Sequence, residues 1–257
     1  MGLDFDHELF TAEQIDQITV VRFKKNLIRR LTDLNLKEGL FNYLHTASND
    51  KVIKVIVCFG NPEKIKCEEI VAFFDELSAS SIGIDKISRV YNAINQLVLL
   101  IREMDKIVVH ADSGEVLSLF LNISLACDYR IIGDKTVFQY PLLEFGLIPK
   151  GGGIFFLAQK LGTSKTMELL MSGEDIDARQ ALELGLVDKV VPSEDIETAA
   201  REAAEKIAGK PMPFISGVKR MMYYAAKDLE SFLDYENAQL LECIKSGCFR
   251  QGSDQCK

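Results

Sequence analysis

Short apolar runs and amphipathic segments alternate along the first half of the chain. The β-branched runs ITVVRF (Ile18–Phe23) and KVIKVIVCF (residues 51–59) predict two strands. The stretch TDLNLKEGLFNYLHTA between them predicts a helix, because its leucines and Phe41 lean to one face. Strand, helix and strand in this order indicate an α/β fold with parallel strands.

The same alternation continues to about Gly153. An amphipathic helix is predicted over residues 84–104, followed by a strand in KIVVHA (residues 106–111). The stretch SGEVLSLFLNISLACDYRII then indicates a buried helix and a further strand that begins near Tyr129.

Helical patterns dominate after Gly153. Asp177 is suited to cap a short helix over residues 178–184, and Gly185 to end it before a strand in LVDKVV. Breaks are predicted at Pro192 and at the pair Pro211 and Pro213. We therefore predict a core over residues 1–192 and a C-terminal helical region over residues 193–257.

Composition and charge limit the partners. The 257 residues are 47% hydrophobic and 26% charged, as in globular proteins, and the net charge of −8 disfavours nucleic acid and anionic membrane surfaces. A local basic run could serve a small polyanion or be a solvated face; it comprises Arg22, Lys24, Lys25, Arg29 and Arg30.

The cysteines and the apolar stretches indicate an intracellular protein. None of the six cysteines forms a C-x-x-C pair, which favours reduced thiols and no metal site. The N-terminal residues lack the basic flank and apolar core of a secretory signal, and the apolar stretch over residues 116–127 is too short to span a membrane. We expect a cytoplasmic location.

Three later segments carry a resemblance to a known family. ACDYRI, then FQYPLLEFGLIPKGGG, then LGTSKTMELLMSGEDIDARQALELGLVDKVVP resemble the crotonase superfamily of enoyl-CoA hydratases and isomerases. The resemblance implies an α/β, crotonase-like spiral of β-β-α turns with a C-terminal helical trimerisation region. It also implies a homotrimer or dimer of trimers that binds an acyl-CoA thioester, with CoA entering as part of the substrate and no separate cofactor.

The family stabilises a thioester enolate with two backbone amides, an oxyanion hole whose donors are each worth about 10²–10³ in rate. By this resemblance the first donor lies near Glu68 and the second at Leu119, in place of the family's central glycine. Leu119 and Phe120 are expected to narrow the pocket, since side chains obstruct the approach that glycine permits.

The hydratase branch of the family carries two glutamates, and the matching positions here are Asn122 and Leu142. Neither side chain exchanges a proton near neutral pH, although asparagine can orient a water molecule. General acid–base catalysis contributes about 10²–10⁴-fold, so ordinary enoyl-CoA hydration is expected to be weak or absent. An isomerase branch places its acid where this chain has Lys150.

Other acids lie nearby. Glu144 is a candidate for a relocated catalytic acid, and its alternative role is a surface carboxylate paired with a base. His110, Asp112 and Glu115 precede the second donor and are further candidates, although a histidine at the end of a strand is also common as an ordinary rim residue.

For the nucleotide end of CoA, the resemblance points to Lys24 and Lys25 as phosphate contacts, since cations bind phosphate oxygens by charge-assisted hydrogen bonds. Two hypotheses follow from these residues. The protein is either an enzyme on a CoA thioester, with an unusual proton donor such as Glu144 or a reaction that needs less proton transfer, or a noncatalytic crotonase-fold binding or assembly subunit.

Overall fold

A computed structural model describes residues 3–24, 30, 33–60, 83–140, 147–224 and 228–245. Its centre is a seven-stranded sheet in the order β1-β2-β3-β4-β5-β7-β10. These strands span, in that order, Phe5–Asp6, Phe10–Ile15, Ile18–Phe23, Val55–Phe59, Ile107–Asp112, Tyr129–Gly133 and Lys189–Val191. Strands β3, β4, β5, β7 and β10 pair in parallel, and β1 and β2 join them as an antiparallel edge. The predicted α/β class is confirmed.

The strand predicted over residues 51–59 is shorter than its apolar run. It begins at Val55, because the Asp50 carboxylate accepts hydrogen bonds from the backbone N–H groups of Val52 (2.7 Å) and Ile53 (3.1 Å) and holds this segment as a turn.

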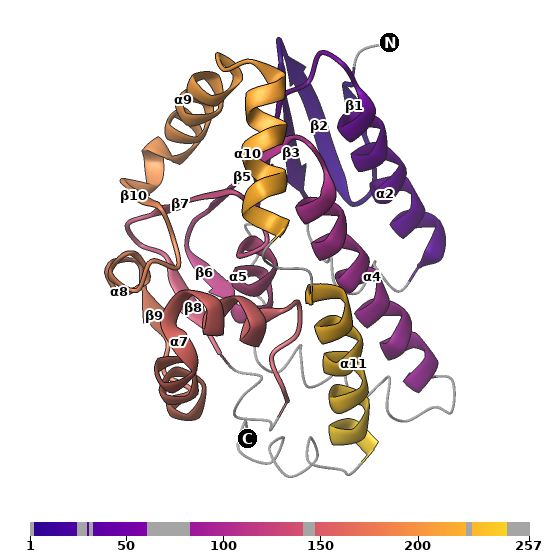
Figure 1. Cartoon of the computed structure of the whole chain (residues 1–257), viewed down its shortest axis with the longest axis vertical. Helices are drawn as coiled ribbons and strands as arrows, with labels where there is room; N and C mark the ends of the chain where they lie inside the picture. The colour runs from indigo at the N-terminus through magenta and orange to yellow at the C-terminus, as the bar shows by residue number, and fades with distance from the viewer. Residues whose placement is uncertain are drawn as a thin grey trace.

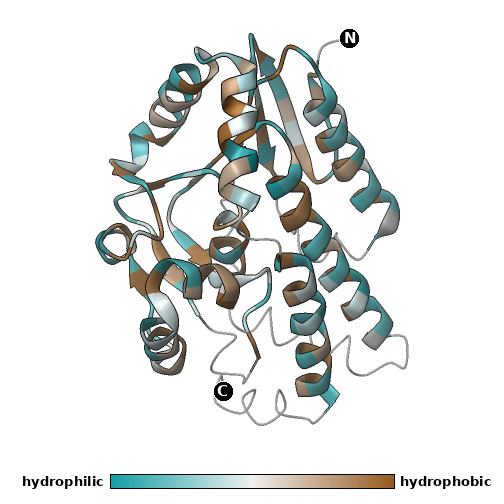
Figure 2. Ribbon diagram, in the orientation of Figure 1, coloured by the Kyte–Doolittle hydropathy of each residue, from teal (hydrophilic) through white to brown (hydrophobic). Residues whose placement is uncertain are grey.

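Helices cover both faces of the sheet (Figure 1). Residues of α2 (Leu34–Asn49) and α4 (Gly83–Glu103) pack in one core with the strand residues of one face. Alanines of α9 (Ile196–Ala208) pack in a second core on the other face. Successive strand residues point to opposite faces, so each parallel strand contributes to both cores. Figure 2 shows α4 and α11 in teal and brown bands, as expected of helices with one apolar face.

A small second sheet lies beside the large one. It joins β6 (Glu115–Leu117), β8 (Val137–Gln139) and β9 (Ile176–Asp177), and the short helix α5 (Ser118–Ser124) follows β6 directly. Helix α7 (Gly153–Ser172) contains Gly162 at φ 77°, where the chain kinks.

The C-terminal part is helical where the structure describes it. Asp177 caps the start of α8 (Ala178–Glu183), as predicted, and the structure adds a capping box with Gln180. The short helix η1 (Ser193–Asp195) leads into α9. Pro213 lies inside α10 (Met212–Tyr224), not at a break; the first turn of a helix tolerates proline because its N–H groups have no helical acceptor. In the described part of the chain, no helix has the length and apolarity to cross a membrane.

The last helix, α11 (Leu229–Lys245), returns to the core and packs along α4 (Figure 1). Leu233 of α11 is 1% exposed and belongs to the same core as α2 and α4. The division between residues 192 and 193 remains a prediction.

Candidate functional site

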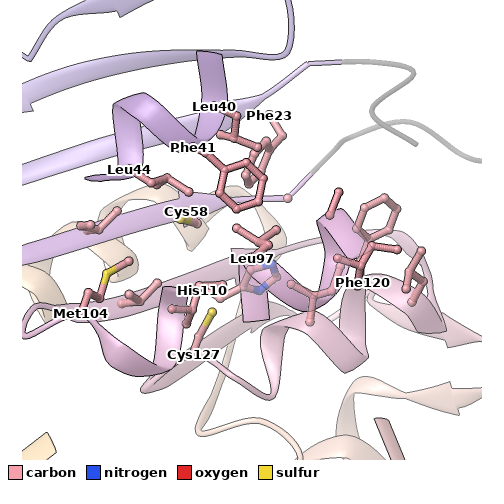
Figure 3. A pocket seen from close by; sticks show the side chains of 18 of the residues that line it. Phe23, Leu40, Phe41, Leu44, Cys58, Leu97, Met104, His110, Phe120 and Cys127 are labelled. Atoms are coloured by element: carbon pink, nitrogen blue, oxygen red, sulfur yellow. The ribbon is translucent and has the colours of Figure 1, made fainter. Parts of the chain in front are cut away.

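An apolar cavity of about 60 Å³ lies where β4 and β5 meet α2, α4 and α5. Its described lining residues are apolar apart from two cysteines and one histidine; they include Leu40, Phe41, Leu97, Leu119, Phe120 and His110. Figure 3 shows the His110 imidazole beside Leu97, with Phe41 above them and Cys127 below. The cavity is therefore suited to an apolar group.

Leu119, the predicted second amide donor, lies in the cavity wall together with Phe120. It stands in the first turn of α5, where backbone N–H groups have no acceptor within the helix. Leu119 as an oxyanion donor remains a prediction.

Asn122 is 1% exposed and packs against the turn that opens α7. Its Nδ2 donates to the Lys150 carbonyl at 2.9 Å. Its Oδ1 is buried with no hydrogen-bond partner in the described part of the chain. A Cβ atom at Gly153 would lie 2.5 Å from the Asn122 Cγ, so glycine at 153 makes room for this carboxamide. Asn122 is thus used to hold a turn, and it is not among the described residues that line the cavity.

Lys150, which the resemblance aligns with the isomerase-branch acid, is part of a buried ion pair. Its Nζ lies 2.7 Å from Glu236 Oε2 on α11 and also donates to Asn95 Oδ1 on α4. The Glu236 carboxylate further accepts from the backbone N–H groups of Gly151 (3.2 Å) and Gly152 (3.0 Å). Burial lowers the pKa of Lys150 and raises that of Glu236, and the opposite charge of each partner opposes these shifts. The Lys150 ammonium group therefore has a structural role, in contacts with Glu236 and Asn95.

Asn95 and Glu236 were not predicted as members of this site. Glu236 stands 86 residues after Lys150, and nothing in the local pattern of α11 distinguishes it from a solvent-facing glutamate.

His110 and Asp112 lie two residues apart on β5, so their side chains share one face of the strand. His110 Nε2 and Asp112 Oδ2 are 3.9 Å apart, and the two side chains are 12% and 4% exposed. Burial, and secondarily the charge of Arg130, lowers the pKa of His110 to about 4. Burial raises the pKa of Asp112 to about 7. Of these two, His110 lines the cavity.

The remaining predicted site residues divide into two groups. Glu68, Leu142, Glu144 and Lys25 lie outside the described residues. Lys24 is described; its Nζ pairs with Asp6 Oδ1 at 2.5 Å on the surface, and it is not among the described cavity-lining residues. Phosphate binding by Lys24 and Lys25 remains a prediction.

Comparison with known proteins identifies the family. The sequence model described as "Enoyl-CoA hydratase/isomerase" matches residues 12–255. The trans-2-decenoyl-[acyl-carrier-protein] isomerase of Streptococcus mutans is 23% identical over 96% of this chain and 92% of its own length. A probable mitochondrial enoyl-CoA hydratase of Dictyostelium discoideum is 31% identical over 70% of this chain and 65% of its own length.

The fold comparison agrees with this assignment. The crystal structure of an enoyl-CoA hydratase from Bacillus halodurans superposes with a TM-score of 0.83 at 19% identity, covering 96% of this chain and all of that one. The crotonase-like fold predicted from the sequence is confirmed. By its sequence match over residues 12–255, the chain belongs to the enoyl-CoA hydratase/isomerase family.

Proposed function

We propose that this protein binds an acyl thioester, with the acyl chain in the apolar cavity, and that it adds water to enoyl thioesters weakly or not at all. The observation that carries the proposal is the cavity itself: leucine, isoleucine and phenylalanine side chains form most of its described wall. Burial of an acyl chain against such a wall contributes about 0.8 kcal/mol per CH₂ group.

Slow hydration follows from what the polar groups near the cavity do. Hydration needs a held water molecule and side chains that take and give protons. Asn122 cannot exchange a proton, and its Nδ2 is occupied by the Lys150 carbonyl. The apolar wall of the cavity offers a water molecule few hydrogen-bond partners.

The residues of this cavity are better suited to catalyse migration of a double bond within the acyl chain than hydration of that bond. This reaction removes one proton from carbon and returns it to another carbon, so a single proton carrier suffices and no water molecule is consumed. The Streptococcus mutans relative is named as an isomerase of a decenoyl group on acyl carrier protein. We extend its substrate class to this chain, with CoA or acyl carrier protein as the thioester carrier.

The test combines calorimetric titration of the full chain with CoA, butyryl-CoA and decanoyl-CoA, and a hydration assay on crotonyl-CoA. Decanoyl-CoA should bind more tightly than CoA and with a negative heat-capacity change, because apolar surface is buried. Crotonyl-CoA hydration should be at least about 10²-fold slower than for a hydratase with both glutamates.

A matched pair of variants locates the binding. Leu97→Asn places an amide in the cavity wall and should weaken decanoyl-CoA binding about tenfold while CoA binding is unchanged. Leu182→Asn makes the same change at an exposed position of α8 and should alter neither. Equal affinity for CoA and decanoyl-CoA, or rapid hydration of crotonyl-CoA, would contradict the proposal.

One observation favours a second function, that of a noncatalytic binding or assembly subunit. Asn122 and Lys150, which the resemblance aligns with acids of family members, hold the turn before α7. This alternative predicts thioester binding that survives Asn122→Ala, with no turnover of any enoyl thioester.

A further inference from the structure

His110 occupies a distinctive place in the cavity wall. Strand β5 alternates, so Val108, His110 and Asp112 point to the face that packs against α2 and α4. Two of these three residues, Val108 and His110, line the cavity. Figure 3 shows the imidazole beside Leu97, among the apolar side chains that line the cavity.

The other described side chains that line the cavity cannot take up or release a proton near neutral pH. The cavity is otherwise apolar except for Cys58 and Cys127. Burial raises the pKa of Cys58 to about 12 and raises that of Cys127 as well, so both thiols stay protonated. Among the described lining residues, His110 therefore has the side chain that can act as a base, through the unprotonated nitrogen of its neutral imidazole.

The carboxyl group of Asp112 is held beside this imidazole. The backbone N–H of Ser113 donates to Asp112 Oδ1 at 3.0 Å, and Oδ2 faces His110 at 3.9 Å. A Cβ atom at Gly60 would lie 2.4 Å from Oδ2, so the absence of a side chain at the end of β4 admits the carboxyl group. Asp112 is thereby fixed between a backbone donor and the imidazole.

We propose that His110 is the proton carrier of a double-bond isomerisation in this cavity and that Asp112 is its positioning residue. The inference rests on the function proposed above and names the group that performs it. The imidazole takes a proton from the α-carbon of a 3-enoyl thioester: the C–H bond breaks, an N–H bond forms, and the electron pair moves into the thioester as a dienolate. The imidazolium then returns the proton to the γ-carbon, which gives the 2-enoyl thioester. No oxidant, reductant or water enters the balance.

The charges around His110 agree with these roles. In the sheet, His110 stands opposite Cys58 of β4 on one side and Arg130 of β7 on the other. Arg130 forms an ion pair with Asp188, with Nη2 and Oδ2 2.6 Å apart. Because the pKa of His110 lies near 4, the imidazole is neutral at pH 7 and can accept a proton. Because the pKa of Asp112 lies near 7, its carboxylate form, which stabilises an imidazolium, becomes populated as the pH rises through 7.

The experiment measures isomerisation of 3-decenoyl-CoA and uptake of deuterium at its α- and γ-carbons from D₂O, with decanoyl-CoA binding measured in parallel. His110→Gln should lower kcat at least about 10²-fold and leave decanoyl-CoA affinity within a few-fold of the native value. His45→Gln, the same change on an exposed face of α2, should change neither quantity. His110→Asn is a second variant in case His110→Gln does not fold.

Asp112→Asn tests the positioning role through the pH profile. The native rate should rise with pH through about 7 as Asp112 ionises and then level off. In Asp112→Asn the rate should be about tenfold lower above pH 7 and should not rise across this range.

The outcomes separate the two proposals. Turnover in His110→Gln at the native rate overturns the assignment of His110 while the proposed function stands. Binding of decanoyl-CoA by the native protein without isomerisation or deuterium uptake also overturns it, and favours a noncatalytic subunit. If the native protein binds neither CoA nor decanoyl-CoA, the proposed function itself fails. An unchanged pH profile in folded Asp112→Asn overturns the role of Asp112.

Discussion

Asn122 and Gly153 share one small space at the start of α7. The Asn122 carboxamide fills the volume that a side chain at 153 would need, and the atoms Cγ and Nδ2 lie 2.5 Å from the position of that Cβ. A methyl group at 153 would therefore overpack this buried contact and disturb the hydrogen bond to the Lys150 carbonyl.

Gly153→Ala should lower the free energy of unfolding by about 1–3 kcal/mol, the usual cost of overpacking. In the Asn122→Ala background the added cost should largely disappear, because the clashing atoms are gone. Urea unfolding of the four proteins in a double-mutant cycle measures this coupling. Gly217→Ala on α10, where a Cβ meets nothing within 4 Å, should instead stabilise the protein by about 0.5–1 kcal/mol. Equal costs of Gly153→Ala in both backgrounds would contradict the account.

At the residue scale, the sequence predicted what depends on local rules. The Asp177 cap was predicted because aspartate is a preferred N-cap residue and stands directly before the helical pattern of residues 178–184. The resemblance located Asn122, but it could not show that the carboxamide points to the turn after Lys150. The period of two in KIVVHAD implies that His110 and Asp112 share a face, and this was the available signal for their pairing.

At the scale of elements, a buried charge pair joins α11 to α4 and to the turn before α7. Lys150 and Glu236 are 4% and 3% exposed, and Asn95 of α4 completes the contact. Because these partners come from three distant segments, the local patterns that predicted each helix could not predict their meeting.

Glu236→Gln should lower the free energy of unfolding by about 3–5 kcal/mol, since it leaves the Lys150 ammonium buried without a counter-charge. The double change Lys150→Met with Glu236→Gln should be less destabilising than Glu236→Gln alone, because that charge is then absent. Urea denaturation monitored by circular dichroism measures both. Glu183→Gln breaks the exposed pair with Arg179 and should change the free energy by less than about 1 kcal/mol. If the double variant has a lower free energy of unfolding than Glu236→Gln alone, this explanation of the ion pair is wrong.

At the scale of the whole molecule, α10 leaves a row of apolar side chains in solvent. Phe214, Val218 and Met221 are 59%, 41% and 79% exposed, and their spacing places them on one face of the helix. The resemblance predicts a homotrimer or a dimer of trimers with contacts from the C-terminal helices, and this row is the surface that we expect to form them.

Light scattering after size-exclusion chromatography should therefore give three or six times the 28.8 kDa chain mass. Met221→Lys should shift the population towards monomer, because a charge in an apolar interface is costly to desolvate. Leu182→Lys, at a residue that is 44% exposed on α8, should leave the mass unchanged. If the native protein is monomeric, the prediction of a trimer or a dimer of trimers is wrong.

The long separation of Glu236 from Lys150 along the chain also has a consequence for synthesis. The carboxylate that anchors Gly151 and Gly152 follows Lys150 by 86 residues. At translation rates of about 5–20 residues per second, Lys150 leaves the ribosome roughly 4 to 17 seconds before its partner. During that interval the lysine stays hydrated and the glycine loop is unanchored, so the nascent chain completes this region only after residue 236 has been made.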